Sequence, residues 1–164
     1  MITWLRHRAF GIIRKAIAIK FPSVPQLSPV ALQAWLRDPD RNPPLLIDTR
    51  HPAEYRQSHL PQAIQVDPDT SMTNLEAQIG KEDREVVFYC SAGYRSSKLA
   101  ARWIKQGHPR THNLEGAIFA WANLGLPMEC EGAPTRSVHP FHPCFSWLIL
   151  KHDAQQPKDN QDMP

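Results

Sequence analysis

The stretch that decides the fold is Val86-Val87-Phe88-Tyr89-Cys90-Ser91-Ala92-Gly93-Tyr94-Arg95-Ser96-Ser97. Its apolar beginning predicts a short buried strand. A helical pattern follows from Ser96 to Gln106, and Gly107 is a natural residue to end that helix. Cys90 therefore stands at the end of a strand, immediately before a tight loop and the start of a helix.

This arrangement predicts a cysteine nucleophile held in an anion-binding cradle. A helix N-terminus and a nearby cation such as Arg95 favour the thiolate, which is the reactive form of cysteine. Gly93 allows a positive φ, so the loop can aim successive backbone N–H groups inward. A second interpretation stays open, in which Cys90 is a core cysteine at a strand end and Arg95 is a surface residue.

Short apolar strands alternate with helices between residues 28 and 124, which indicates an α/β fold with a parallel β-sheet flanked by α-helices. The expected strands are Leu45–Ile47 ending at Asp48, Ala63–Val66, Val86–Tyr89 and Thr111–Leu114. The expected helices are Ser28–Leu36 with Ser28 as its N-cap, Ser71–Ile79, Ser96–Gln106 and Ala117–Leu124. Reactive groups of parallel sheets gather beyond the carboxyl ends of the strands, where Cys90 falls.

Residues 2–20 predict a basic amphipathic helix, which is stopped by the segment from Phe21 to Pro25. One half of its helical wheel is rich in isoleucine, and Arg14 and Lys15 lie on the other half. The interpretation we favour is a helix packed on its own domain or on a partner. The alternatives are a helix lying on a membrane surface and a disordered segment.

A chain of 164 residues with a net charge of +3 fits one domain with extensions and carries too little charge to indicate nucleic-acid binding. We expect an amphipathic helix over residues 1–22, the main domain over 23–130 and a proline-rich extension over 131–164, disordered from about Asp153. No stretch is apolar enough to span a bilayer. Three cysteines do not suit a secreted disulfide framework, so a cytoplasmic setting is expected, with membrane association through residues 2–20 left open.

Three ordered segments of the chain stand at the separations of a known family. They are Leu46-Ile47-Asp48-Thr49-Arg50 with Glu54-Tyr55 and His59-Leu60-Pro61-Gln62-Ala63-Ile64, then the loop from Cys90 to Ser97, then Leu114-Glu115-Gly116-Ala117 with Trp121, Gly125, Leu126 and Pro127. Together they resemble a rhodanese-like domain over Ser28 to Pro127. Ser58 and Ala117 depart from the family pattern, in which glycine is frequent at both positions.

The resemblance implies a sulfurtransferase in which Cys90 accepts sulfane sulfur as a persulfide from thiosulfate or another donor. A small thiol, cyanide or an acceptor protein then removes the sulfur in a ping-pong reaction. The residues implied in holding the persulfide and the donor are Ser91, Ala92, Gly93, Tyr94, Arg95 and Ser96. No dissociable cofactor is implied, because the sulfur is carried on Cys90.

Two further features of the resemblance concern polar residues outside the loop. Asp48 and Arg50 match a family pair, and we interpret them as structural support that ties loops together at a strand end. His59 also matches a family position. We interpret it as a packing histidine rather than a catalytic base.

Two other functions stay open on sequence. Phosphatases and arsenate reductases of this architecture have five residues between cysteine and arginine, whereas four separate Cys90 from Arg95 here. The shorter loop makes a tighter cradle, which suits one sulfur atom better than a tetrahedral oxyanion. The other alternative is a non-catalytic interaction module or sulfur carrier, although binding domains of this type lack the cysteine.

Four residues near the C-terminus are of types that bind zinc, namely Cys130, His139, His142 and Cys144. Their spacing matches no familiar zinc pattern, and the prolines between them stiffen the segment. We therefore predict no metal site and a proline-rich tail packed on the domain. A role for Cys130 or Cys144 in receiving sulfur from Cys90 stays open.

Overall fold

The computed structural model describes residues 2–80, 84–142, 146, 148 and 149, with side chains from Arg8 onward. In chain order the elements are α1 (Ile2–Lys20), β1 (Gln26–Leu27), α2 (Pro29–Arg37), β2 (Leu45–Asp48), α3 (Pro52–Gln57), β3 (Ile64–Gln65), α4 (Met72–Ile79), β4 (Val86–Tyr89), α5 (Tyr94–Lys105), β5 (Thr111–Leu114), α6 (Ala117–Asn123), β6 (Met128–Cys130) and β7 (Ala133–Thr135).

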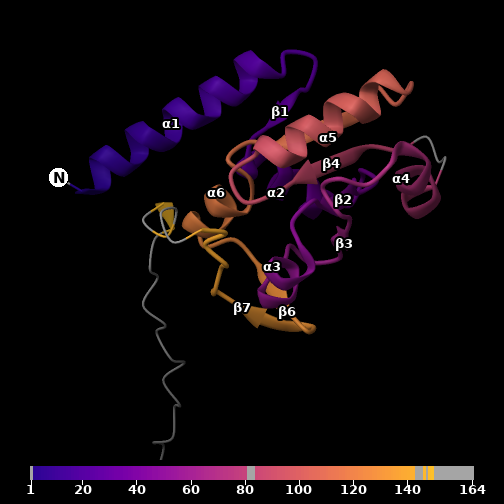
Figure 1. The fold of residues 1–164 in the computed structure, drawn as a ribbon. Helices are drawn as coiled ribbons and strands as arrows, with labels where there is room; N and C mark the ends of the chain where they lie inside the picture. Colours follow the sequence, from indigo (N-terminus) through magenta and orange to yellow (C-terminus); the bar gives the residue numbers. More distant parts are fainter. Residues whose placement is uncertain (1, 81–83, 143–145, 147, 150–164) are drawn as a thin grey trace, which may run out of the picture.

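A five-stranded sheet with the order β1-β5-β4-β2-β3 forms the centre of the molecule, and all its strand pairs are parallel (Figure 1). Every residue of β2 and β4 is buried. Parallel strands are covered on both faces, which is why short continuous apolar runs form strands here. The parallel α/β sheet flanked by helices that the sequence predicts is confirmed.

The core lies on both faces of this sheet, because successive residues of a strand point to opposite sides. Leu46, Val87 and Tyr89 face the layer that contains α2 and α6. Leu45, Ile47, Val86 and Phe88 face the layer that contains α4 and α5. Trp121 of α6 and Trp103 of α5 are the largest side chains of these two layers, and both are almost completely buried.

The N-terminal helix α1 lies near the β1 edge of the sheet and packs on its own domain (Figure 1). Phe10 and Ile13 contact the α6 side of the core, and Ile17 is buried. Arg14 lies 3.5 Å from Glu115. Ile12 and Ile19 instead face solvent, with 67% and 80% of their surface exposed. No described helix is long and apolar enough to cross a membrane.

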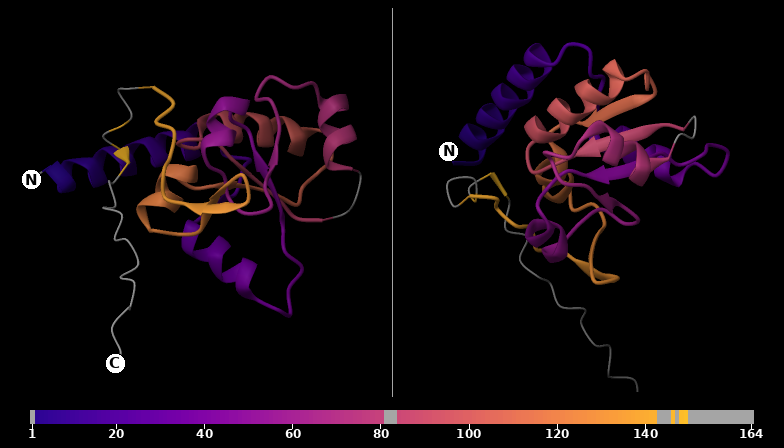
Figure 2. Two further views of the ribbon diagram at one scale, coloured as in Figure 1. Left: turned by 90° about the horizontal axis from the view of Figure 1, so that it is seen from below. Right: turned by 45° about the vertical axis from the view of Figure 1, so that its right-hand side comes forward.

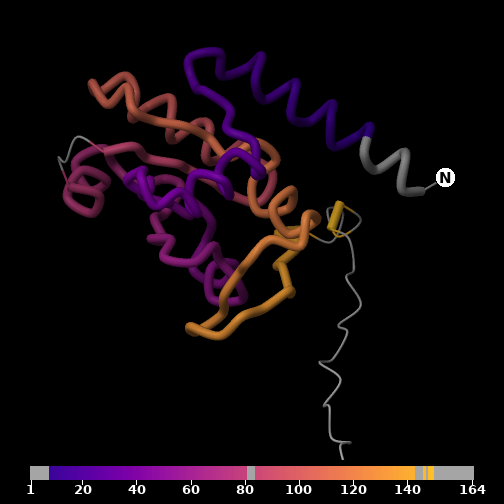
Figure 3. The backbone as a smooth tube through the Cα atoms, turned by 180° about the vertical axis from the view of Figure 1, so that it is seen from behind, coloured from indigo at the N-terminus to yellow at the C-terminus, as the bar shows by residue number. Residues whose placement is uncertain are grey.

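The antiparallel hairpin of β6 and β7 lies at the other side of the domain, beside α3, in both views of the ribbon (Figures 1 and 2). His59 and Glu129 join it to the segment after α3 through a pair of backbone hydrogen bonds of 2.9 Å. Seen from behind, the chain then returns toward the side of the domain where α1 lies (Figure 3). The expected domain boundary at residue 130 falls inside this hairpin.

The predicted elements differ from the structure in a few places. The helix expected from Ser96 begins two residues earlier, at Tyr94, because Gly93 takes a left-handed conformation with φ of 111° and starts the helix directly. The strand expected over Ala63–Val66 pairs only at Ile64–Gln65. The sequence analysis missed β1, α3 and the hairpin. The end expected to be disordered from about Asp153 lies outside the described residues.

Gly116 offers a test of how α1 is held against α6. Its φ is +69°, and an added Cβ would lie 2.7 Å from both Ala120 Cβ and Phe10 Cε1. Gly125 has nearly the same φ, +67°, but an added Cβ there would meet no heavy atom within 4 Å. We expect Gly125→Ala to cost about 1 kcal/mol of stability and Gly116→Ala to cost a further 1–3 kcal/mol or so, because only the second also overpacks the core.

Urea unfolding of the two variants and the wild type measures this difference. Equal losses in both glycine variants would contradict the contact between Phe10 of α1 and the start of α6.

Candidate active site

Cys90 follows the last residue of β4, and only 2% of its surface is exposed. The start of α6 fixes the backbone here, since Ile118 N donates to Cys90 O at 3.1 Å and Phe119 N donates to Ser91 O at 3.1 Å. Ala117 adopts a φ of 51° to make this approach. That conformation explains why glycine suits the position, and for alanine it is strained.

A cradle of hydrogen-bond donors surrounds the Cys90 sulfur. Gly93 N lies 3.1 Å from Sγ, and Ser96 Oγ lies 3.4 Å from it. The Ser96 hydroxyl also reaches Asn113 Oδ1 at 2.6 Å, so its single proton can serve either acceptor. Because α5 begins at Tyr94, the positive end of its dipole lies at the same place. The loop therefore favours negative charge on sulfur.

A pocket of about 200 Å³ opens over Cys90. Its lining is mostly apolar, with Phe119 and Phe141 among its walls and Ala92 in the loop. Tyr94 and Phe141 are each 45% exposed. The pocket is large enough for a sulfur atom with a small group attached, and its walls displace water from the reacting sulfur.

Arg95 binds Glu54 of α3 through two nitrogens. Nη1 donates to Glu54 Oε2 and Nη2 donates to Glu54 Oε1, each at 2.9 Å. Ser91 Oγ completes the group, since it accepts from Arg95 Nη2 and donates to Glu54 Oε1 at 2.9 Å. Burial would raise the pKa of the Glu54 carboxyl, but the hydrogen bond and charge of Arg95 outweigh it and hold the pKa at about 2. Glu54 is therefore ionised at neutral pH.

The pKa of Arg95 is raised above its ordinary value by the same neighbours. Burial opposes the charge of the guanidinium, but the hydrogen bond to Glu54 and the electrostatic interactions with Cys90 and Glu54 outweigh this cost. Arg95 therefore interacts with both the Cys90 sulfur and the Glu54 carboxylate. The family resemblance implies that Arg95 binds the sulfur donor. In the structure, the Arg95 guanidinium already binds the Glu54 carboxylate before any donor arrives.

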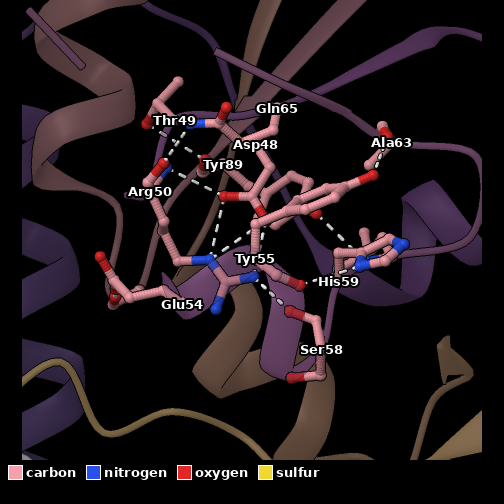
Figure 4. Close-up of polar contacts among 12 residues, drawn as sticks. Asp48, Thr49, Arg50, Glu54, Tyr55, Ser58, His59, Ala63, Gln65 and Tyr89 are labelled. Atoms are coloured by element: carbon pink, nitrogen blue, oxygen red, sulfur yellow. Dashed lines mark hydrogen bonds and ion pairs between the residues drawn. The ribbon is translucent and has the colours of Figure 1, made fainter. Parts of the chain in front are cut away.

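Asp48 and Arg50 form a buried ion pair at the end of β2 (Figure 4). Arg50 Nη2 lies 2.6 Å from Asp48 Oδ2, and it also donates to the carbonyl oxygen of Ser58. The pair therefore connects the strand end to the segment after α3. Ser58 has a φ of −170°, which any residue adopts, so no glycine is required at this position.

His59 packs against Tyr55, with ring centroids 3.9 Å apart (Figure 4). Its Nδ1 lies 3.0 Å from the carbonyl oxygen of Tyr55, and its Nε2 lies 3.3 Å from Glu129 Oε1. Both ring nitrogens thus have partners on α3 and the hairpin. This geometry agrees with a packing role.

Several residues that shape the site were not predicted from the sequence. Glu54 stands in the first resembling segment, but its partner Arg95 is 41 residues away and no local pattern reveals the pair. Asn113 contacts Ser96 from β5, and Phe119 and Phe141 reach the pocket from α6 and the C-terminal segment. The one signal in the sequence for this pair was the acidic residue Glu54, six positions after Asp48.

The residues considered as metal ligands are not gathered together in the described part of the chain, where no three such side chains form a cluster. Cys130 Sγ donates to the carbonyl oxygen of Arg56 at 3.2 Å. His139 Nδ1 accepts from the backbone of Phe141 at 3.0 Å. Cys144 lies outside the described residues.

Comparison with known proteins identifies the family. The profile of the rhodanese-like domain matches residues 28–124. The chain belongs to the rhodanese-like domain family. A solved thiosulfate sulfurtransferase from Pseudomonas aeruginosa shares the fold with a TM-score of 0.61 and 19% identity, covering 78% of this chain and 24% of that one. A rhodanese-like domain protein from Staphylococcus aureus has a TM-score of 0.55 and 22% identity over 66% of this chain and 99% of its own.

Two curated relatives with different names match parts of this chain. A sulfurtransferase of Allochromatium vinosum is 44% identical over 84 residues, which are 51% of this chain and 77% of that protein. A tRNA uridine(34) hydroxylase of Escherichia coli is 32% identical over 115 residues, 65% of this chain. The match spans only 32% of the hydroxylase. The sulfurtransferase relative and the family match support a general sulfurtransferase activity for this rhodanese-like protein.

The ion pair of Glu54 should make the free energy of unfolding depend on pH in the acid range. Its pKa is about 2 in the folded protein against an ordinary 4.5, so its ion pair stabilises the fold fully above pH 4.5 and is lost as pH falls through about 2. The full effect corresponds to about 3 kcal/mol. We expect the stability difference between wild type and Glu54→Gln to shrink by about 2 kcal/mol between pH 6 and pH 3.

Urea unfolding of both proteins at the two pH values checks this expectation. A difference that stays constant with pH would show that the Glu54 carboxylate is not specifically stabilised by Arg95.

Proposed function

We propose that this rhodanese-like protein is a sulfurtransferase that carries sulfane sulfur as a persulfide on Cys90. The observation that carries the proposal is the cradle around the sulfur. Gly93 N at 3.1 Å and Ser96 Oγ at 3.4 Å both point donors at Cys90 Sγ. Such donors stabilise an anion on the sulfur, and they would equally hold the outer sulfur of a persulfide.

The reaction has two transfers at the same sulfur. The Cys90 thiolate attacks the outer sulfur of the donor, the sulfur–sulfur bond of the donor breaks, and its electron pair leaves with the remaining group, which is sulfite when thiosulfate is the donor. An acceptor thiolate or cyanide then attacks the outer sulfur of the Cys90 persulfide. The bond to Cys90 breaks and the thiolate is regenerated.

The surroundings of Cys90 suit this chemistry better than phosphoryl or arsenate chemistry. The pocket of about 200 Å³ has aromatic walls. Only four residues separate Cys90 from Arg95, which makes a cradle that suits one sulfur atom better than a phosphate or arsenate group. Sulfur of low charge density is better accommodated between aromatic walls than a fully hydrated oxyanion.

We further propose that the acceptor is a small thiol, cyanide or a protein thiol, and that the reaction uses no dissociable cofactor and no nucleic acid. The exposed rings of Tyr94 and Phe141 at the pocket leave room for an acceptor to approach Cys90. We also propose a cytoplasmic location, with membrane contact through the solvent-exposed face of α1.

Cys90→Ser should abolish persulfide formation. We expect the intact mass of the reduced wild type to increase by one sulfur after incubation with a sulfane sulfur donor, and the variant to show no increase. Cys130→Ser is the matched control, since Cys130 is a half-buried cysteine outside the pocket, and it should load like the wild type. Sulfur gain on Cys90→Ser would contradict the proposal.

Arg95→Ala should weaken the use of thiosulfate. The change removes the only cation among the described pocket residues and leaves the charge of the nearby buried Glu54 carboxylate uncompensated, so we expect the KM for thiosulfate to rise about tenfold or more. Steady-state kinetics with cyanide as acceptor measures this effect. An unchanged KM would remove Arg95 from the donor site.

A further inference from the structure

We propose that Glu54 makes the Cys90 pocket select a persulfide donor of low net charge over the thiosulfate dianion. The inference rests on the proposed function and names its donor class. Glu54 is the specificity-determining residue because it neutralises the one cation that a dianion would need.

The geometry of the pair leaves little positive charge for a donor. Glu54 binds two nitrogens of the Arg95 guanidinium, each at 2.9 Å, and its side chain is only 4% exposed. Solvent therefore screens the pair weakly. Ser91 Oγ bridges the same two side chains at 2.9 Å. Because the contact is bidentate and nearly buried, the Arg95–Glu54 pair presents no net charge to a donor.

Glu54 is also fixed in place by its own helix. Its Oε2 accepts a hydrogen bond from His51 N at 3.1 Å and so caps the first turn of α3. In Figure 4 its carboxylate points away from the buried pair of Asp48 and Arg50. An incoming anion that displaced the Glu54 carboxylate from Arg95 would therefore also break this hydrogen bond to His51 N.

The charge around the sulfur follows from these contacts. Arg95 is the only cation among the described residues that line the pocket. Lys20 lies nearby, but its Nζ is 4.9 Å from the ring centroid of Tyr94, on a neighbouring hollow bounded by α1. When Cys90 attacks a donor as the thiolate, the side chains of Cys90, Arg95 and Glu54 together carry one negative charge.

The two donor classes place different demands on this site. With a persulfide R–S–S–H, the Cys90 thiolate attacks the outer sulfur, the electron pair of the broken bond leaves with R–S⁻, and the proton stays on the transferred sulfur. The charge of the reacting atoms stays at −1 throughout. Thiosulfate brings two negative charges and leaves as the sulfite dianion, next to a negative cluster and between aromatic walls, where desolvation of a dianion is costly.

The test compares the loading of Cys90 by two donors in a single turnover. Reduced protein is mixed with thiosulfate or with cysteine persulfide, and the second-order rate constant for sulfur gain is followed by intact mass. We expect the wild type to load faster from cysteine persulfide. In Glu54→Gln, which keeps an oxygen for the His51 cap, the ratio of the thiosulfate rate constant to the persulfide rate constant should rise about tenfold or more.

Glu85→Gln is the matched control. Glu85 precedes β4 and pairs with His112 at 3.0 Å, at the opposite end of the strand from Cys90. Removal of this carboxylate should leave the ratio unchanged.

Tyr94→Lys keeps the inference testable if Glu54→Gln folds poorly, because Tyr94 is exposed and lines the pocket. A cation there has no carboxylate partner in the pocket and should also raise the ratio. A wild type that loads equally well from both donors, or a ratio unchanged in the folded variants, would overturn the inference alone. Failure of both donors to load Cys90 would overturn the proposed function and the inference with it.

Discussion

The turn from β4 into α5 at Gly93 is the constraint on which the site depends. Its φ of 111° reverses the chain so closely that an added Cβ would lie 3.3 Å from Asn113 Nδ2 and 3.6 Å from Ile17 Cδ1. Only this short turn brings the Gly93 N–H and the first turn of α5 onto the Cys90 sulfur. A longer loop would carry the helix dipole away from the sulfur.

Two ion pairs compensate the charges around this turn. Asp48 and Arg50 cancel each other in the interior and hold the end of β2 to Ser58. Glu54 and Arg95 cancel each other closer to the pocket. Breaking a buried pair leaves an unpaired charge, which costs several kcal/mol, so each pair constrains the backbone that carries it. The negative charge that reacts is then confined to Cys90.

Elements outside the matched domain also contact the loop that follows Cys90. Ile17 of α1 approaches Gly93, and Phe21 packs edge-on against Tyr94 with ring centroids 5.5 Å apart. Phe141 covers Arg95, with the guanidinium carbon 4.4 Å from its ring centroid. The N-terminal helix and the C-terminal segment thus reach the same pocket from opposite ends of the chain. The entrance of the pocket is therefore formed in part by residues outside the matched domain.

The sequence by itself determined the α/β class, the buried strand Val86–Tyr89, the N-cap Ser28 and the place of Cys90 at a strand end. These features depend on local periodicity, on capping and on motifs of a few residues, which a linear pattern records. The sequence shows that Ala117 departs from a position where glycine is frequent, and the structure shows its φ of 51°. Only the tertiary structure paired Arg95 with Glu54, placed Phe141 over the pocket and packed α1 on α6. Those contacts join residues far apart along the chain, and they exist only because the parallel sheet brings the ends of β2, β4 and β5 to one edge.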